Sequence, residues 1–157
     1  MDGSAIGYAG MAGAIGLIRD SSGFWVLGFS LKMGIATKNM AELELVRQGL
    51  LLAWELGFRF IQLELDSVTV LSWITDITSS YSLDVMSLIC DCRSLMEQDW
   101  EVEACYIYRE ANGCANALAK QGTHQQQLLS IYTTCPSFVY SCLVRDLAGL
   151  GSSRLCA

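Results

Sequence analysis

The chain has 157 residues, of which 52% are hydrophobic and 17% are charged. These values exclude a disordered chain and predict a compact globular protein, most simply one domain with a sizeable core. The formal net charge of −6 argues against a general nucleic-acid binder with a basic surface, and the ten Lys and Arg residues form no run. Contact with a polyanion must therefore depend on the placement of these cations in three dimensions, or on metal ions.

The cysteines and the N-terminal segment bear on the cellular compartment. The seven cysteines form no C-x-x-C pair and His124 is the only histidine, so buried free thiols in a reducing compartment are expected rather than a structural zinc site. The uncharged stretch 3–18 lacks the basic region of a signal peptide, and charges interrupt every other apolar run before about 20 residues, the length that spans a membrane. The sequence predicts an intracellular protein of the nucleus or cytoplasm with no membrane association.

The first elements expected along the chain are strands. Ala12–Arg19 and Phe24–Met33 are rich in branched and aromatic residues, and the residues between them, 20–23, have the composition of a turn. These two segments predict a β-hairpin. Asp2 and the residues beside it are expected to be the end of a strand that precedes the hairpin.

A helix, a stop and a strand follow. Asn39 is a suitable N-cap, and Glu42 stands three residues later, the spacing of a capping box. Gly57 suits the left-handed position just after a helix. The segment Ile61–Leu65 alternates as a strand, and Ser67 can cap a second helix. Apolar residues recur at helical spacing along the first helix, at Leu43, Val46, Leu50, Ala53 and Trp54.

The remaining pattern predicts helices over 68–77 and 83–98, a strand over 101–108 and a short helix over 114–121. The order of elements predicts an α/β fold with a mixed sheet flanked by helices. The periodicity weakens beyond Gly122. We therefore expect a domain over residues 1–122 and a partly ordered C-terminal extension over 123–157, in which 137–147 could form a helix or an added strand.

Four polar residues are expected at the ends of these elements: Asp2, Glu42, Asp66 and Asn116. Asp66 is of special interest, because open α/β sheets bind ligands where the carboxyl end of a strand meets a helix. Oxygen ligands of this kind suit hard divalent cations such as Mg²⁺, and two such ions about 3.5–4 Å apart can bracket a displacement at phosphorus.

Five motifs in the right order resemble the ribonuclease H type-1 domain, in the reverse-transcriptase-associated form common in plant genomes. The resemblance covers about residues 1 to 122, and no single motif is specific. The motifs are D-G-S at Asp2–Ser4, I-R-D-x-x-G-x-W at Ile18–Trp25, A-E-L at Ala41–Leu43, L-E-L-D-S at Leu63–Ser67 and R-E-A-N-x-x-A-N-x-L-A at Arg109–Ala119.

The resemblance implies a five-stranded mixed sheet, with three antiparallel strands followed by parallel crossovers, flanked by helices. It implies an enzyme that cuts the RNA strand of an RNA–DNA hybrid by two-metal phosphodiester hydrolysis. We also expect the protein to be a monomer. The ions would be Mg²⁺ or Mn²⁺, with no small-molecule cofactor.

Residue by residue, the resemblance implies that Asp2 contacts both metal ions and that Glu42 and Asp66 hold the ion on the leaving-group side. Asn116 stands where the family has an Asp that helps to hold the water-activating ion, so it is expected to be a weakened fourth ligand. The residues that would contact nucleic acid are Gly3, Ser4, Ser67 and Asn112.

The chain departs from the family pattern at several places. Asn116 lacks a negative charge, and Tyr106 stands where the family commonly has a histidine. Only Met1 precedes Asp2, and the segment 75–82 carries no Lys or Arg that could grip a hybrid. These departures leave an alternative open, a catalytically weakened or inactive ribonuclease H-like nucleic-acid-binding module of retroelement origin.

Each candidate residue also has an ordinary structural explanation. Glu42 could be only the second partner of a capping box, and Asp66 could be an acid favoured by the dipole at a helix start. Asp2 could be a solvated charge, and Asn112 and Asn116 could belong to a turn and a helix surface. The metal-site hypothesis depends on all four positions of Asp2, Glu42, Asp66 and Asn116 coinciding in space.

Overall fold

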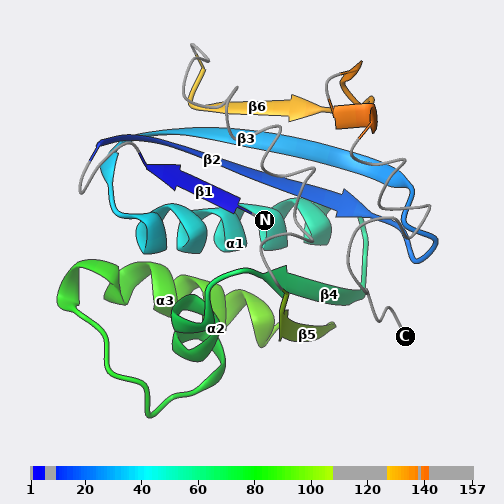
Figure 1. The fold of residues 1–157 in the computed structure, drawn as a ribbon. Coiled ribbons are helices and arrows are strands. Elements are labelled where there is room, and N and C mark those ends of the chain that lie inside the picture. The colour runs from blue at the N-terminus through cyan, green and yellow to red at the C-terminus, as the bar shows by residue number, and fades with distance from the viewer. Residues whose placement is uncertain (1, 6–9, 108–126, 138, 142–157) are drawn as a thin grey trace.

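The computed structural model describes residues 2–5, 10–107, 127–137 and 139–141, and it describes side chains from residue 14 onward. Two sheets lie on opposite sides of one long helix, α1, with two further helices beside the smaller sheet (Figure 1). The larger sheet is antiparallel and has the strand order β1-β2-β3-β6, with β1 Asp2–Ala5, β2 Gly10–Arg19, β3 Trp25–Ala36 and β6 Leu129–Tyr132.

The predicted hairpin is confirmed as β2 and β3, and its turn explains one of the motifs. The Asp20 Oδ1 atom accepts hydrogen bonds from the backbone N–H groups of Ser22 and Phe24, each at 2.9 Å. Gly23 has φ of +84°, a left-handed conformation that glycine adopts without steric cost. The D-x-x-G part of the motif therefore shapes a turn.

Helix α1 spans Lys38–Glu55, and it begins two residues earlier than a cap at Asn39 would predict. Its N-cap is Thr37, whose backbone is extended and whose Oγ1 accepts from the backbone N–H of Met40 at 3.3 Å. The prediction that Asn39 caps the helix is wrong, because Thr37 satisfies the same requirement first and Asn39 is already helical. Glu42 consequently lies in the second turn and cannot be the N3 partner of a capping box. The predicted left-handed residue at the other end is confirmed, with Gly57 at φ +84°.

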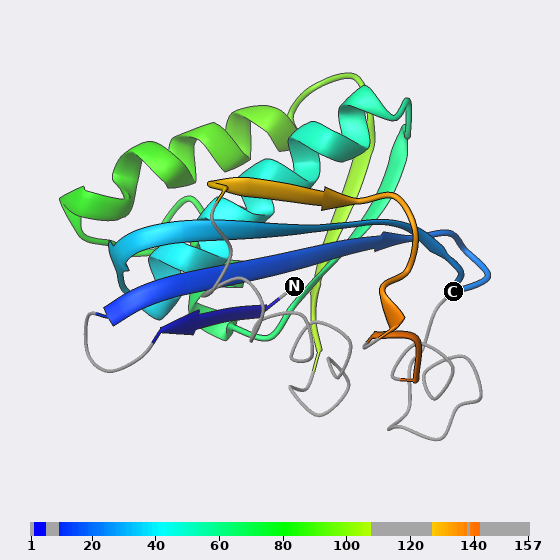
Figure 2. The same ribbon diagram turned by 90° about the horizontal axis from the view of Figure 1, so that it is seen from above.

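One core, which we call the antiparallel-side core, lies between α1 and the larger sheet. Seen from above, α1 crosses behind the long strands β2 and β3 (Figure 2). The buried members of this core come from the two long strands and from one face of the helix: Ala14, Leu27, Phe29, Leu31, Ala36, Ala41, Leu45 and Leu52.

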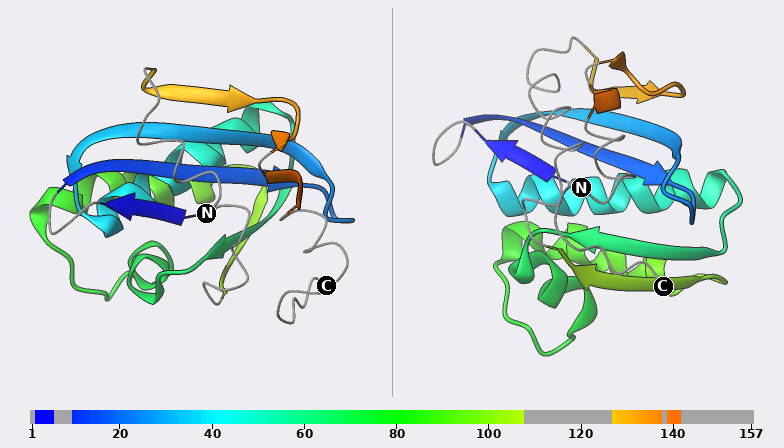
Figure 3. Two further views of the ribbon diagram at one scale, coloured as in Figure 1. Left: turned by 45° about the horizontal axis from the view of Figure 1, so that its top comes forward. Right: turned by 45° about the vertical axis from the view of Figure 1, so that its right-hand side comes forward.

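The opposite face of α1 forms the parallel-side core with β4 Phe60–Leu65, α2 Val68–Thr75 and α3 Leu83–Met96 (Figure 3). Helix α1 therefore lies between the two cores and contributes buried residues to both. The members of the parallel-side core are Leu43, Val46, Leu50, Leu63, Leu65, Val70, Ile74, Val85, Ile89 and Cys92. In the part of the chain that the structure describes, no helix is both long and apolar enough to cross a membrane.

The smaller sheet contains β4 and β5, Glu101–Tyr106, paired in parallel from Phe60 opposite Glu101 to Leu65 opposite Tyr106. The mixed α/β class with flanking helices is confirmed. The single five-stranded sheet is not, because the described strands number six and fall into two sheets. A pocket of about 440 Å³ lies between β2, α1 and β4, and Arg19 and Glu64, which form an ion pair between Nη2 and Oε2 at 3.5 Å, are among its lining residues.

The sixth strand comes from the C-terminal extension and was not predicted. β6 pairs antiparallel with β3, with Gly28 opposite Tyr132, and residues 137 and 139–141 are helical. Val139 is fully buried against Ile15 on the face of the sheet that α1 does not cover. The described part of the extension is therefore packed on the sheet, while the boundary predicted at residue 122 lies outside the described residues.

Candidate metal and nucleic-acid site

Glu42 is a fully buried carboxylate, with an exposed fraction of 0%. Its neighbours along the helix, Ala41 and Leu43, belong to the antiparallel-side core and the parallel-side core respectively. Burying a carboxylate is costly unless charged or hydrogen-bonding groups compensate, so a helix gains nothing from such a residue for packing alone. The position of Glu42 therefore favours a role at a site over an ordinary capping role.

Asp66 lies between the end of β4 and the start of α2. Ser67 is the N-cap of α2, as predicted, since its Oγ accepts from the backbone N–H of Val70 at 3.2 Å. Asp66 precedes the cap and so stands outside the first helical turn. Its side chain has an exposed fraction of 0%, and its Oδ1 lies 3.8 Å from Nζ of Lys38. The ordinary explanation was an acid favoured by the dipole at a helix start. Asp66 does not fit it, because its side chain is buried, lies outside the first turn and has a cation beside it.

Two interactions join the start of α1 to the junction of β4 and α2. One is the ion pair between Lys38 and Asp66, and the other is a hydrogen bond at 3.5 Å in which Ser67 Oγ donates to Asn39 Oδ1. Residues four apart on a helix share a face, so Lys38 and Glu42 lie on the same side of α1. The structure thus brings the start of α1, which carries Glu42, to the junction that carries Asp66.

The backbone of Asp2 begins β1 and pairs with Ile15 of β2, and Gly3 and Ser4 pair with Ala14 and Gly13. Two views show the start of β1 near the C-terminal end of β4, the end that leads into Asp66 (Figures 1 and 3). The side chains of residues 2–4 lie outside the described part. The metal role of Asp2 and the nucleic-acid roles of Gly3 and Ser4 therefore stay predictions.

The end of β5 lies at the same edge. Tyr106 pairs with Leu65, and the backbone N–H of Ile107 donates to the Leu65 carbonyl at 2.8 Å, so the chain leaves β5 beside Asp66. Tyr106, which replaces the family's histidine, is 41% exposed there. Asn112 and Asn116 follow but lie outside the described residues, so their roles also stay predictions.

The donor chemistry of this edge suits a hard divalent cation. Glu42 and Asp66 offer carboxylate oxygens from two separate elements, which such ions prefer, and the ammonium group of Lys38 shows that a cation is accommodated at Asp66. Among the side chains that the structure describes, no three His, Cys, Asp or Glu residues are grouped closely enough to hold a metal ion. A complete ligand set would therefore need the predicted contribution of Asp2 or Asn116.

The described cysteines do not suggest a second metal site. Cys90, Cys92, Cys105 and Cys135 are free, and only Cys92 is buried. Its thiol donates a hydrogen bond to the Leu43 carbonyl at 3.5 Å, and burial raises its pKa to about 12. The expectation of buried free thiols therefore holds for Cys92 and is wrong for the exposed Cys90.

A basic side chain does approach the segment 75–82, although none lies within it. Arg93 of α3 donates from Nε to the Trp73 carbonyl at 2.9 Å and from Nη2 to the Asp76 carbonyl at 3.0 Å. Its guanidinium group lies 5.7 Å from the ring centre of Tyr81. Arg93 therefore closes the C-terminal end of α2, which explains its position without a nucleic-acid contact.

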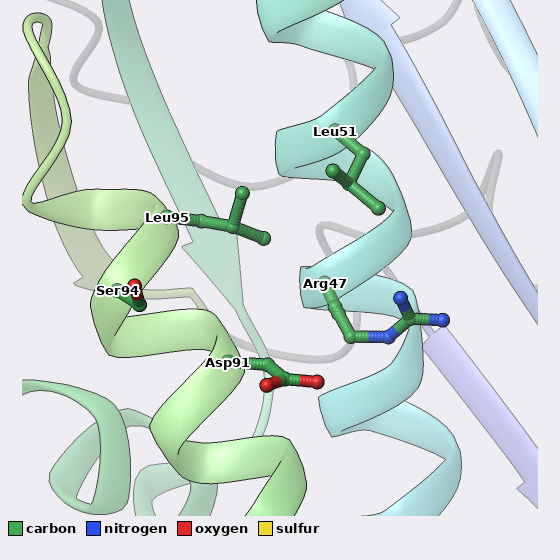
Figure 4. A pocket seen from close by; sticks show the side chains of 5 residues that line it. All are labelled: Arg47, Leu51, Asp91, Ser94 and Leu95. Atoms are coloured by element: carbon green, nitrogen blue, oxygen red, sulfur yellow. The ribbon is translucent and has the colours of Figure 1, made fainter.

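A second pocket, of about 240 Å³, opens between α1 and α3 and shows no comparable chemistry. Figure 4 shows Asp91 and Leu95 of α3 extending towards α1, which contributes Arg47 and Leu51. Arg47 forms an ion pair with Glu44 on its own helix, and the hydrogen bond to Glu44 is the main cause of its raised pKa. The only cationic residue that lines the pocket is thus already engaged.

Sequence reasoning missed the roles of Lys38 and Asn39. Asn39 was assigned to capping, whereas its side chain accepts from Ser67, and Lys38 was not considered. One signal could have found Lys38, namely its separation of four residues from the candidate acid Glu42.

Comparison with known proteins supports the relationship suggested by the motifs. A family model described as reverse transcriptase-like matches residues 1–122. The chain is 34% identical over 154 residues to a putative ribonuclease H protein of Arabidopsis thaliana, which covers 98% of this chain. The match spans only 24% of that longer protein.

Solved ribonuclease H structures share the fold. RNase H1 from the archaeon Halobacterium salinarum has a TM-score of 0.73 and 26% identity, over 78% of this chain and 93% of its own. LC11-RNase H1, solved in complex with an RNA/DNA hybrid, has a TM-score of 0.73 and 20% identity, over 78% of this chain and 93% of its own. This chain therefore belongs to the reverse transcriptase-like family, the reverse-transcriptase-associated form of the ribonuclease H type-1 domain.

Proposed function

We propose that the chain is a nuclease that cuts the RNA strand of an RNA–DNA hybrid with two Mg²⁺ or Mn²⁺ ions. Its family supports a nuclease of the ribonuclease H type, and one structural relative binds an RNA/DNA hybrid. The observation that carries the proposal is the pair of buried acids, Glu42 and Asp66, whose elements are joined by the contacts of Lys38 with Asp66 and of Ser67 with Asn39.

In this proposal Glu42 and Asp66 would hold the ion on the leaving-group side, and Asp2 would contact both ions. The side-chain carbonyl of Asn116 would be a weaker ligand on the nucleophile side, because it adds no charge. Bound ions of this kind lower the pKa of a water molecule and stabilise the leaving oxygen. The protein's contribution is to hold the acids rigidly, since Glu42 is fixed between two cores and Asp66 lies directly before a capped helix.

Contacts with the hybrid are proposed for Gly3, Ser4, Ser67 and Asn112. Ser67 illustrates how such a contact can form, because its hydroxyl donates to Asn39 over a long 3.5 Å and accepts from Val70. The hydroxyl proton can therefore turn to a phosphate oxygen while the cap of α2 is kept. Because the net charge of −6 repels a polyanion and salt screens this repulsion, affinity should fall only weakly with salt and should rise with divalent ions.

The test is cleavage of a hybrid whose RNA strand carries an end label, with Mg²⁺ or Mn²⁺. Asp66→Asn and Glu42→Gln should each reduce the rate by about a hundredfold or more, the scale found when one preorganised charged or polar group is removed from a site. Glu103→Gln is the matched control, since Glu103 is exposed on β5 and should leave the rate unchanged. Circular dichroism of each variant verifies folding.

A further variant tests the fourth position. Asn116→Asp restores a negative charge and should raise the rate at low metal concentration, and equal rates would contradict the role assigned to Asn116. Hybrid binding without cleavage by any variant would instead identify an inactive nucleic-acid-binding module. The proposal also places the protein in the nucleus or cytoplasm.

A further inference from the structure

Lys38 reaches from the surface towards a buried acid. Its Nζ lies 3.8 Å from Asp66 Oδ1, and the exposed fractions of the two side chains are 41% and 0%. A buried carboxylate is costly without a compensating charge, and this ammonium group supplies one. The pair therefore joins a half-exposed cation to an acid from which solvent is excluded.

The position of Lys38 in α1 is unfavourable for a lysine by itself. It is the first residue of the helix, directly after the N-cap Thr37, and the first turn contains no acid that would balance its charge. The positive end of the helix dipole disfavours cations at this place. The interaction with Asp66 offsets that repulsion. The presence of a lysine at position 38 is therefore explained by Asp66 and not by the helix itself.

The same side of α1 carries Glu42, one turn further along. The ammonium group of Lys38 is therefore attached to the helical face from which one candidate metal ligand comes, and it contacts the other, Asp66. A metal ion at Asp66 and the ammonium group of Lys38 would repel each other at short range, because the Asp66 side chain is buried and little water is present to screen the two charges.

We propose that Lys38 is a built-in counter-ion of Asp66 that a divalent cation must displace. It is a positioning residue: it compensates the Asp66 charge in the metal-free chain and weakens the affinity of the site for metal. This inference rests on the proposed function in one respect, the assignment of Asp66 as a metal ligand. The half-exposed side chain of Lys38 has room to withdraw towards solvent when the metal binds.

The test compares the full chain with Lys38→Gln, Asp66→Asn, the double variant, and Lys32→Gln as a control with the same change of charge. Lys32 lies on β3, in the larger sheet. Mn²⁺ affinity is measured by titration calorimetry, and thermal unfolding is measured without metal. Lys38→Gln should lower the Kd for Mn²⁺ by about tenfold, the scale of one nearby charge at a partly screened site. Lys32→Gln should change it less than twofold, and Asp66→Asn should abolish the effect of Lys38→Gln.

Without metal, the single variants at 38 and 66 should each lower the melting temperature, and the double variant should lower it by less than their sum. Additive changes would overturn the pairing. An unchanged Kd in Lys38→Gln, in a chain that binds Mn²⁺ and cuts hybrid, would overturn this inference and leave the proposed function intact. Tighter Mn²⁺ binding without cleavage by any variant would reject the function and keep the inference. Absence of Mn²⁺ binding in both the unchanged chain and Lys38→Gln would reject both.

Discussion

The two sheets of this protein are built in different ways. In the larger sheet the strands are antiparallel, and β2 and β3 are joined by a turn of a few residues. In the smaller sheet β4 and β5 are parallel, so the chain between them must cross over, and it does so through α2 and α3. The larger sheet can therefore be specified by local signals, whereas the smaller one depends on helices packing against it.

The two parts of the molecule also differ in what they contribute to the candidate site. Asp66 follows β4 in the parallel part, and Glu42 lies on α1, the helix that contributes to both cores. Parallel strands direct their carboxyl ends to one edge, which brings the end of β5 beside Asp66. The antiparallel part contributes a rigid support for α1, together with the backbone of Asp2 at the start of β1.

The sharpest way to test this division is to weaken each core separately. Phe29→Ala in the antiparallel-side core should reduce the free energy of unfolding by about 3–5 kcal/mol, because the ring is 1% exposed. Ile89→Ala in the parallel-side core should cost about 2–5 kcal/mol, since Ile89 is fully buried. Because α1 belongs to both cores, each variant should still unfold in a single transition, measured by far-UV circular dichroism and tryptophan fluorescence in denaturant.

Two exposed residues serve as controls for the core variants. Ile35 lies on the same strand as Phe29 and is 77% exposed, and Leu83 lies on the same helix as Ile89 and is 83% exposed. Replacing either by Ala should change stability by no more than about 0.5 kcal/mol. Two separate transitions in Ile89→Ala would show that the parallel part unfolds independently. That result would contradict the claim that α1 couples the two cores.

A smaller effect is expected from adding one methyl group to the larger sheet. A Cβ at Gly16 would lie 2.2 Å from Cζ of Phe29, so Gly16→Ala must displace a ring that is already packed in the core. Overpacking of this kind costs about 1–3 kcal/mol. Gly34→Ala on β3 is the control, because a Cβ there meets no atom within 4 Å. Equal stabilities for the two variants in urea titrations would disprove the close packing of Gly16 against Phe29.

The last effect is absent at neutral pH and concerns the pH dependence of the parallel-side core. Burial raises the pKa of Cys92 from 9.0 to about 12 in the folded chain. Between these values the unfolded thiol loses its proton while the folded thiol keeps it, so stability is complete below pH 9 and falls as pH rises towards 12. The contribution of this group should reach about 1.4 kcal/mol per pH unit within that window.

The measurement for Cys92 is the free energy of unfolding from pH 8 to 11, under reducing conditions. Cys92→Ala should have a shallower decline than the unchanged chain, whatever its stability at pH 7. Cys90→Ala is the matched control, because Cys90 is an exposed thiol on the same helix and its removal should leave the slope as it was. A decline that is identical in all three chains would mean that other groups cause it.

The sequence alone determined those features that depend on a few neighbouring residues. The Asp20 to Gly23 turn, the left-handed Gly57 and the Ser67 cap are short-range hydrogen-bond or φ requirements, so they could be read directly. The acids Glu42 and Asp66 were also identified from the sequence, first by their expected places at the ends of elements and then by the family resemblance of their motifs. Asn116 was identified in the same way, and its role remains a prediction.

Only the tertiary structure decided how these pieces meet. Thr37 and Asn39 are both good N-caps, and local rules cannot choose between them; the choice of Thr37 makes Lys38 the first helical residue, within reach of Asp66. The pairing of β6 with β3 and the burial of Glu42 between two cores join segments far apart along the chain. Such contacts follow from the packing of whole elements, and for that reason no local pattern could specify them.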